Sequence, residues 1–168
     1  MEEGFKCSCC GEIHEGLPLD YGAKAPDYYL DIPPEEREKR AHLTEDVCIV
    51  DNEFFFVRGC VEIPILDEDN FFIWGVWASL SKKSYERLIE LWDVENVESE
   101  PPFFGWLNTL LPVYPQTLGL KTNVYLRAKN QRPSIELEPT EHPLAVEQQN
   151  GITMKRVQEI AEIILHGE

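Results

Sequence analysis

The chain has 168 residues, 43% of them hydrophobic, and its 31 acidic against 15 basic side chains give a formal net charge of −16. A chain of this length can bury enough apolar surface to fold without disulfide bonds, so we expect one domain over residues 1–168. The negative charge argues against nucleic acid and membrane surfaces as partners, because both attract proteins through lysine and arginine.

The N-terminus carries no targeting pattern. Its first four residues, MEEG, have neither the basic nor the apolar region of a secretory signal. No apolar run approaches the roughly 20 residues of a membrane span. We therefore expect a cytoplasmic protein, in which the five cysteines are thiols or metal ligands before they are disulfides.

The N-terminal segment lacks a regular pattern. Residues 5–32 combine cysteine, glycine and proline with little periodicity. This composition predicts an irregular lobe, similar to a zinc knuckle, that needs something other than regular secondary structure to order it. Pro33 and Pro34 then open a short solvated helix over residues 35–43. An α+β core is expected over residues 45–168.

A β pattern follows the short helix. Strands are predicted over residues 47–50, 54–58, 60–66 and 71–79, connected as an antiparallel meander. The last of them is apolar on both faces, which predicts a central strand covered on both sides. Gly75 in its middle predicts a bulge or the close approach of another group.

The strands are followed by a helix and a second hairpin. Ser81 can cap a helix over residues 82–93 that covers one face of the sheet. After an irregular stretch that reaches Pro115, strands over residues 124–128 and 134–138 are predicted to pair.

Two helices end the chain. His142 is placed as the N-cap of a helix that begins at Pro143 and stops near Gly151. Thr153 caps the final helix. The fold class is therefore α+β, an antiparallel sheet meander packed by helices, with an irregular N-terminal lobe. The apolar positions of the final helix, which we expect to be buried, are Val157, Ile160, Ala161, Ile164 and Leu165.

The segment CSCCGEIH carries the most specific chemistry. Cys7 and Cys10, followed by a glycine, have the spacing at which a tight turn directs two sulfurs to one zinc ion. Structural zinc takes four ligands, so two more are needed. His14 can close the loop as a third, and Cys48 can tie the lobe to the core as a fourth. The predicted site is a structural zinc on Cys7, Cys10, His14 and Cys48.

Other assignments of the thiols stay open. His42 is an alternative to Cys48 as the fourth ligand, whereas Cys9 should point away and Cys60 fits better as a buried core thiol. The simplest alternative is that all five cysteines are plain thiols. A redox role for Cys7 and Cys10 is disfavoured, because no βαβ pattern surrounds them.

Catalytic and ligand-binding candidates are few. The usual phosphate-loop, dinucleotide, metalloprotease and hydrolase motifs are absent from the sequence. His142 with Glu147 one helical turn later could act as an acid and base pair, although a capping histidine is the more ordinary interpretation. Among the many aromatic side chains, Trp106 and Tyr114 are the candidates for exposed contacts with a partner or ligand.

The chain resembles a bacterial family known only as a domain of unknown function, with an N-terminal CxxCG motif and a C-terminal HPLAxEQ motif. The resemblance implies that the four predicted zinc ligands belong to the family's pattern and that Cys9 does not. It also directs attention to His142 and Gln148. The matching residues are 5–14 (FKCSCCGEIH), 25–29 (APDYY), 36–37 (ER), 46–48 (DVC), 62–64 (EIP), 74–77 (WGVW), 104–107 (FGWL), 114–117 (YPQT), 142–148 (HPLAVEQ) and 151–152 (GI).

The charge is distributed unevenly. Residues 1–100 hold 24 acidic and 9 basic side chains, whereas residues 101–168 hold 7 and 6. An acidic region of this kind suits a basic protein partner, although a merely solvated face is the commoner case. The leading hypothesis is a non-enzymatic, metal-stabilised module that binds or regulates another protein, in the way that immunity proteins neutralise basic toxins. The alternative is an enzyme with a cleft near His142.

Overall fold

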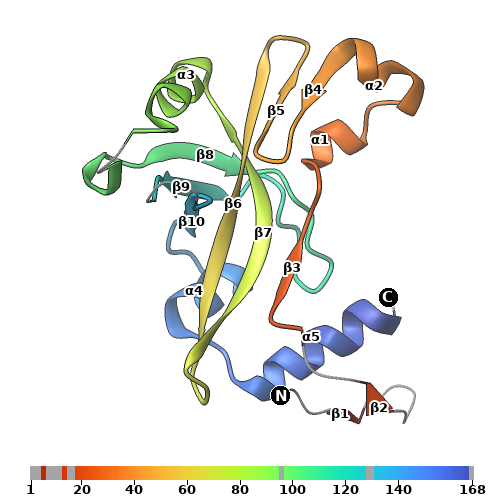
Figure 1. Cartoon of the computed structure of the whole chain (residues 1–168). Helices are drawn as coiled ribbons and strands as arrows, with labels where there is room; N and C mark the ends of the chain where they lie inside the picture. Colours follow the sequence, from red (N-terminus) through yellow and green to blue (C-terminus); the bar gives the residue numbers. More distant parts are fainter. Residues whose placement is uncertain (1–4, 7–12, 15–17, 95–96, 128–130, 167–168) are drawn as a thin grey trace.

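A computed structural model describes residues 5–6, 13–14, 18–94, 97–127 and 131–166, with the backbone alone for 5–6, 13–14, 98 and 166. Its centre is a closed five-stranded barrel with extra strands and helices around it (Figure 1). The barrel strands are β6 (Phe54–Ile65), β7 (Asn70–Leu80), β8 (Phe103–Leu107), β9 (Lys121–Tyr125) and β10 (Ser134–Leu137).

Consecutive barrel strands are antiparallel, and the last pair closes the barrel in parallel. β6 and β7 form a long hairpin in which Phe55 pairs with Leu80 and Ile65 with Asn70. β10 returns to β6 through the pairing of Ser134 with Cys60. The α+β class is thus confirmed. The predicted open meander is wrong, because the pairing of β10 with β6 closes the sheet into a barrel.

Three short strands extend this sheet, and two more form a separate hairpin. β3 runs parallel to the middle of β7, while β5 and β4 continue antiparallel from the first half of β6. β1 and β2 pair only with each other. Their bounds are Phe5–Lys6 for β1, Ile13–His14 for β2, Asp20–Gly22 for β3, Ala41–Leu43 for β4 and Val47–Val50 for β5.

The helices lie at both ends of the barrel. Figure 1 shows α1 and α2 beside β4 and β5 at one end, and α4 and α5 at the other. α3 packs against β6 and β7. Their bounds are Asp27–Leu30 for α1, Pro34–Arg40 for α2, Lys82–Leu91 for α3, Pro143–Asn150 for α4 and Met154–His166 for α5, with one 3₁₀ turn, η1, at Val97–Ser99.

Strand alternation fills the barrel interior. On β7 the side chains of Phe72, Trp74, Val76 and Ala78 are at most 2% exposed and form the main core. The other face of β7 is covered at Trp77, which packs with Ile32, Val50 and Phe56 in a second cluster. The predicted burial of both faces therefore holds in the middle of β7, whereas Phe71 at its start is half exposed.

Two glycines allow strands to approach closely. The predicted close approach at Gly75 is confirmed, because an added Cβ would lie 3.0 Å from the Cα of Gly22 in β3. At Gly59 a Cβ would lie 2.7 Å from the Cδ1 of Ile135 in β10. Gly59 was expected to separate two strands. Instead it lies within the continuous strand β6, at the point where β10 closes the barrel.

The predicted N-terminal lobe is not supported where the structure describes it. Residues 20–22 form β3, and the α1 helix follows, so this part of residues 5–32 joins the core sheet. Cys7 and Cys10 lie outside the described residues. Within the described residues, no helix combines the length and apolar character that crossing a bilayer requires.

Candidate functional site

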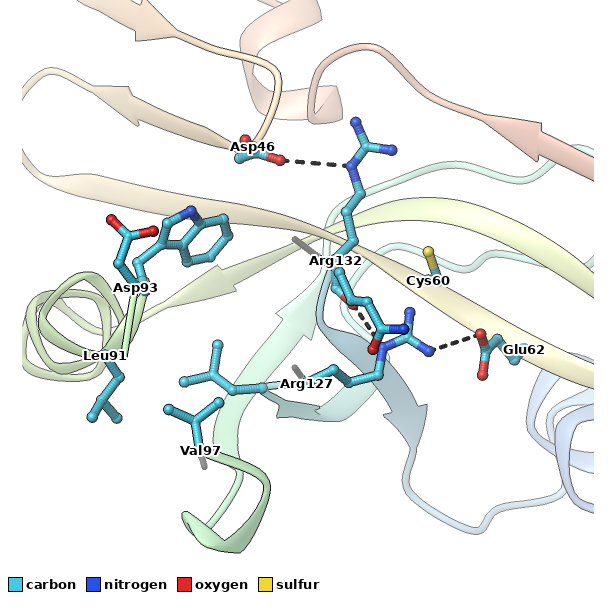
Figure 2. Close-up of a pocket in the computed structure, with 11 residues that line it drawn as sticks. Asp46, Cys60, Glu62, Leu91, Asp93, Val97, Arg127 and Arg132 are labelled. Carbon is cyan, nitrogen blue, oxygen red and sulfur yellow. Dashed lines mark hydrogen bonds and ion pairs between the residues drawn. The ribbon is translucent and has the colours of Figure 1, made fainter. Parts of the chain in front are cut away.

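A cavity of about 640 Å³ opens on the outside of the barrel (Figure 2). It lies between the C-terminal end of α3, the η1 turn, the middle of β6 and the described residues between β9 and β10 (126–127 and 131–133), which we call the β9–β10 connection. Its lining residues are Asp46, Cys60, Glu62, Leu91, Trp92, Asp93, Val97, Leu126, Arg127, Gln131 and Arg132. We call it the outer pocket.

The outer pocket has an apolar side and a charged side. Leu91 and Val97 lie toward α3 and η1, whereas Arg127, Arg132 and Glu62 lie toward β6 and the β9–β10 connection (Figure 2). A ligand that filled this volume would therefore contact both apolar and ionic groups.

Strand alternation places the charged side. On β6 the inward positions include Val61 and Ile63, so Cys60 and Glu62 point outward. Nη1 of Arg127 donates to Oε2 of Glu62 at 2.9 Å, and its Nε donates to the backbone oxygen of Arg132 at 2.7 Å. Arg127 thus holds the β9–β10 connection against β6.

The Cys60 thiol lines this pocket instead of lying in the core. Burial is the main influence on its pKa and raises it, while the positive charges of Arg127 and Arg132 act in the opposite direction. No histidine is among the described residues that line the pocket. The thiol therefore stays protonated at neutral pH and has no neighbouring imidazole base to activate it.

A second surface feature lies on the outer face of β8. Phe104 and Trp106 are 43% and 46% exposed, and their rings meet edge to face with centroids 5.1 Å apart. Phe54, 36% exposed, lines the same shallow hollow as these two rings, together with Glu53. We call Phe54, Phe104 and Trp106 the β8 aromatic surface. The predicted exposure of Trp106 is confirmed.

The predicted exposure of Tyr114 is wrong. Tyr114 is 7% exposed, and its hydroxyl accepts a hydrogen bond from Nε1 of Trp74 at 3.0 Å. The same hydroxyl donates to Oε1 of Glu147 at 2.7 Å, while Nε of Arg156 donates to Oε2 of Glu147 at 2.8 Å. Burial, followed by the Glu147 carboxylate, raises the pKa of Tyr114 well above its usual value. The phenol is therefore a structural link between the core and the C-terminal helices.

His142 is the N-cap of α4, as the sequence predicts. Its Nδ1 accepts from the backbone N–H of Leu144 at 3.1 Å, which places the ring proton on Nε2. Nε2 lies 3.2 Å from the backbone oxygen of Pro115 and 3.0 Å from that of Gln116. Both ring nitrogens thus have backbone partners, and Glu147 is bonded to Tyr114 and Arg156 instead of His142.

The side chain of Gln148, on α4, forms hydrogen bonds with the backbone of β10. Its Oε1 accepts from the backbone N–H of Leu137 at 2.8 Å, and its Nε2 donates to the backbone oxygen of Ile135 at 3.0 Å. The side-chain amide therefore bonds to the backbone of β10 and joins α4 to the barrel. Together, His142, Glu147 and Gln148 give the HPLAxEQ segment a structural explanation.

The structure describes only some of the predicted zinc ligands. Cys7 and Cys10 lie outside the described residues, and His14 is described only through its backbone in β2. Cys48 is fully buried in the second core cluster, where burial raises the pKa of its thiol to about 11. Its candidate replacement, His42, is exposed on β4. Among the described residues, no three or more His, Cys, Asp or Glu side chains gather as a metal site.

Comparison with known proteins gives a family and nothing more specific. A family described as uncharacterized proteins conserved in bacteria, DUF2199, matches residues 6–152. The chain belongs to this family. No curated protein and no solved structure matches the chain significantly. The resemblance expected from the sequence is confirmed at the level of the family.

Proposed function

We propose that this protein is a non-enzymatic binding module that takes a basic protein partner on its β8 aromatic surface. The observation that carries the proposal is the exposed pair Phe104 and Trp106 on a barrel strand. Large aromatic side chains are the residues that most often dominate the binding energy of protein interfaces. Here they lie on a rigid strand, so little conformational freedom is lost when a partner covers them.

The charge of the chain favours a basic partner. Residues 1–100 carry a net charge of −15, and Glu53 lies in the same hollow as the aromatic rings. Complementary charge around an aromatic contact accelerates association and makes it sensitive to salt.

The side chains that could support catalysis are engaged in structural contacts, which favours a binding function over an enzymatic one. Both ring nitrogens of His142 lie against backbone groups, and Glu147 bonds to Tyr114 and Arg156. Burial raises the pKa of the Cys60 thiol, and the described residues that line the outer pocket include no histidine. These arrangements weaken the alternative of an enzyme centred on His142.

The test is affinity capture with three forms of the tagged full-length chain: wild type, Trp106→Ala and Phe71→Ala. Phe71 is the matched control, because it is a half-exposed aromatic residue at the opposite end of β7 from the strand's contact with β8. We expect a basic protein to be retained by wild type and Phe71→Ala. Loss of Trp106 should weaken its affinity by about 30-fold, the effect of removing a hot-spot side chain.

Binding is then measured with the purified partner at low and at high salt. The affinity should fall as salt rises, since the partner's positive charge meets an acidic surface. An acidic partner, binding indifferent to salt, or equal loss with Phe71→Ala would each contradict the proposal.

We also propose that a structural zinc ion orders the N-terminal segment. The support is the CxxCG spacing of Cys7 and Cys10, with His14 four residues later as a third ligand. Elemental analysis of the purified chain tests this proposal.

A further inference from the structure

Four of the partly buried arginines of this protein direct guanidinium N–H groups at nearby oxygens. Arg37 donates to two backbone oxygens at 3.0 Å, and Arg40 makes three hydrogen bonds of 3.1 Å or less. Arg127 and Arg156 bind carboxylates at 2.9 and 2.8 Å. This is the expected behaviour, because guanidinium N–H groups removed from water must find acceptors.

Arg58 and Arg132 differ from these four. In each, Nε is buried and has no hydrogen-bond partner within the described part of the chain. The remaining contacts are long: Nε of Arg132 lies 3.6 Å from Oδ1 of Asp46, and Nη1 of Arg58 lies 3.4 Å from the backbone oxygen of Glu45. One buried N–H donor of each guanidinium group, on Nε, therefore has no acceptor among the described residues.

The two guanidinium groups are close enough for their charges to interact, although only Arg132 lines the pocket and Nη2 of Arg58 lies beside Gly22 of β3. Arg58 precedes Cys60 by two residues on the outer face of β6, and Arg132 lines the outer pocket beside Cys60 (Figure 2). Burial is the main cause that lowers the pKa of Arg58, and the positive charge of Arg132 is the second. Asp46 is the carboxylate near both. Two neighbouring guanidinium groups repel each other, and an anion that accepted from a buried, unpaired N–H would offset this repulsion and satisfy the donor.

We propose that the outer pocket binds the oxyanion group of a small ligand at the guanidinium group of Arg132, with Arg58 supplying a second positive charge behind it. The planar fork of an arginine matches the oxygens of a phosphate or a carboxylate. The ligand's apolar part lies along Leu91 and Val97, on the opposite side of the pocket (Figure 2). This site is distinct from the β8 aromatic surface, so the two proposals stand or fall separately.

The site is tested by titrating the ¹⁵N-labelled full-length chain with phenyl phosphate and with benzoate at constant ionic strength. Each probe combines an oxyanion with an aromatic body, and phenol is the neutral control. The arginine Nε–H signals of Arg58 and Arg132 report binding directly. We expect saturable shifts of both signals with at least one anionic probe and none with phenol. The tighter probe identifies the oxyanion as phosphate or carboxylate.

Arg132→Gln should raise the dissociation constant at least about tenfold, since it removes charge-assisted hydrogen bonds. Arg87→Gln is the matched control, because Arg87 is an exposed arginine of α3 paired with Glu90. It should leave the affinity unchanged. The proposal is overturned if neither phenyl phosphate nor benzoate produces saturable shifts. Equal binding of phenol also overturns it, as does a loss of affinity in Arg87→Gln as large as that in Arg132→Gln.

Discussion

The hydroxyl of Tyr114 connects three elements through a single atom. It accepts from Trp74 on β7 and donates to Glu147 on α4, and Glu147 in turn binds Arg156 on α5. The guanidinium carbon of Arg156 also lies 5.6 Å from the centre of the Tyr114 ring. The docking of both C-terminal helices therefore depends on one phenol that is almost removed from water.

We predict that Tyr114→Phe lowers the free energy of unfolding by about 1–3 kcal/mol, because it leaves the Trp74 N–H and a Glu147 oxygen without their partner. Urea denaturation measures the change. Tyr125→Phe is the control, since Tyr125 is a partly exposed tyrosine of β9 and its hydroxyl has no hydrogen-bond partner in the described chain. Equal stability of Tyr114→Phe and wild type would show that the link contributes nothing.

The pH dependence of stability gives a second readout of the same hydroxyl. The pKa of Tyr114 is raised in the folded chain, whereas in the unfolded chain it has the ordinary value of about 10. The unfolded state therefore loses this proton first. The stability that Tyr114 contributes is complete below pH 10 and is lost as the pH rises above it. At pH 11 wild type should have lost about 1.4 kcal/mol more than Tyr114→Phe.

At the scale of elements, α4 depends on its first residue. His142 caps the helix through Nδ1 and reaches the loop before β9 through Nε2. We predict that His142→Ala costs about 1–2 kcal/mol of stability in thermal or urea unfolding. His142→Asn should recover the capping part, because asparagine is a good N-cap. His42→Ala, on the exposed strand β4, should change stability by less than about 0.5 kcal/mol. A loss in His42→Ala equal to that in His142→Ala would refute the capping role.

Elements with local signals could be predicted from the sequence. Ser81 accepts from the N–H of Ser84, the hydroxyl of Thr153 accepts from that of Arg156, and β9 pairs with β10 as expected. Each signal is contained within a few residues or one hairpin. The final helix is confirmed as Met154–His166, and the predicted burial holds for Val157, Ile160 and Ala161 but is wrong for Ile164 and Leu165, which are exposed.

Features that depend on distant contacts could not be predicted in this way. β8 lies in a stretch expected to be irregular, and it becomes a strand because β7 and β9 pair with it on either side. Closure of the barrel brings residue 134 to residue 60, which no local pattern indicates. The outer pocket was missed for the same reason. The alternation of Arg58, Cys60 and Glu62 on one face of β6 was the available signal, but its interpretation required the correct strand register.

At the scale of the whole molecule, the acidic region is not a separate unit. Residues 1–100 supply β6 and β7, and the nearly neutral remainder supplies the other three barrel strands. The only charged residues of β6 and β7 themselves are Arg58 and Glu62, so the excess negative charge of residues 1–100 lies outside the barrel strands. Two cationic side chains of residues 101–168, Arg127 and Arg132, pair with carboxylates of residues 1–100, Glu62 and Asp46. Only the carboxylates that are not paired with a cationic side chain of the protein remain available to a basic partner.

The zinc proposal is tested by the metal content of the whole chain. We predict one equivalent of zinc in the wild-type protein and its loss in Cys7→Ser, because structural zinc sites need every thiolate. Cys48→Ala is the informative comparison. Cys48 is fully buried among apolar side chains on β5, and Figure 1 shows β5 and the β1–β2 hairpin at opposite ends of the molecule. We therefore expect Cys48→Ala to lose stability as a core substitution and to retain zinc. Loss of zinc in Cys48→Ala would restore Cys48 as the fourth ligand, whereas folded wild-type protein without zinc would remove the site altogether.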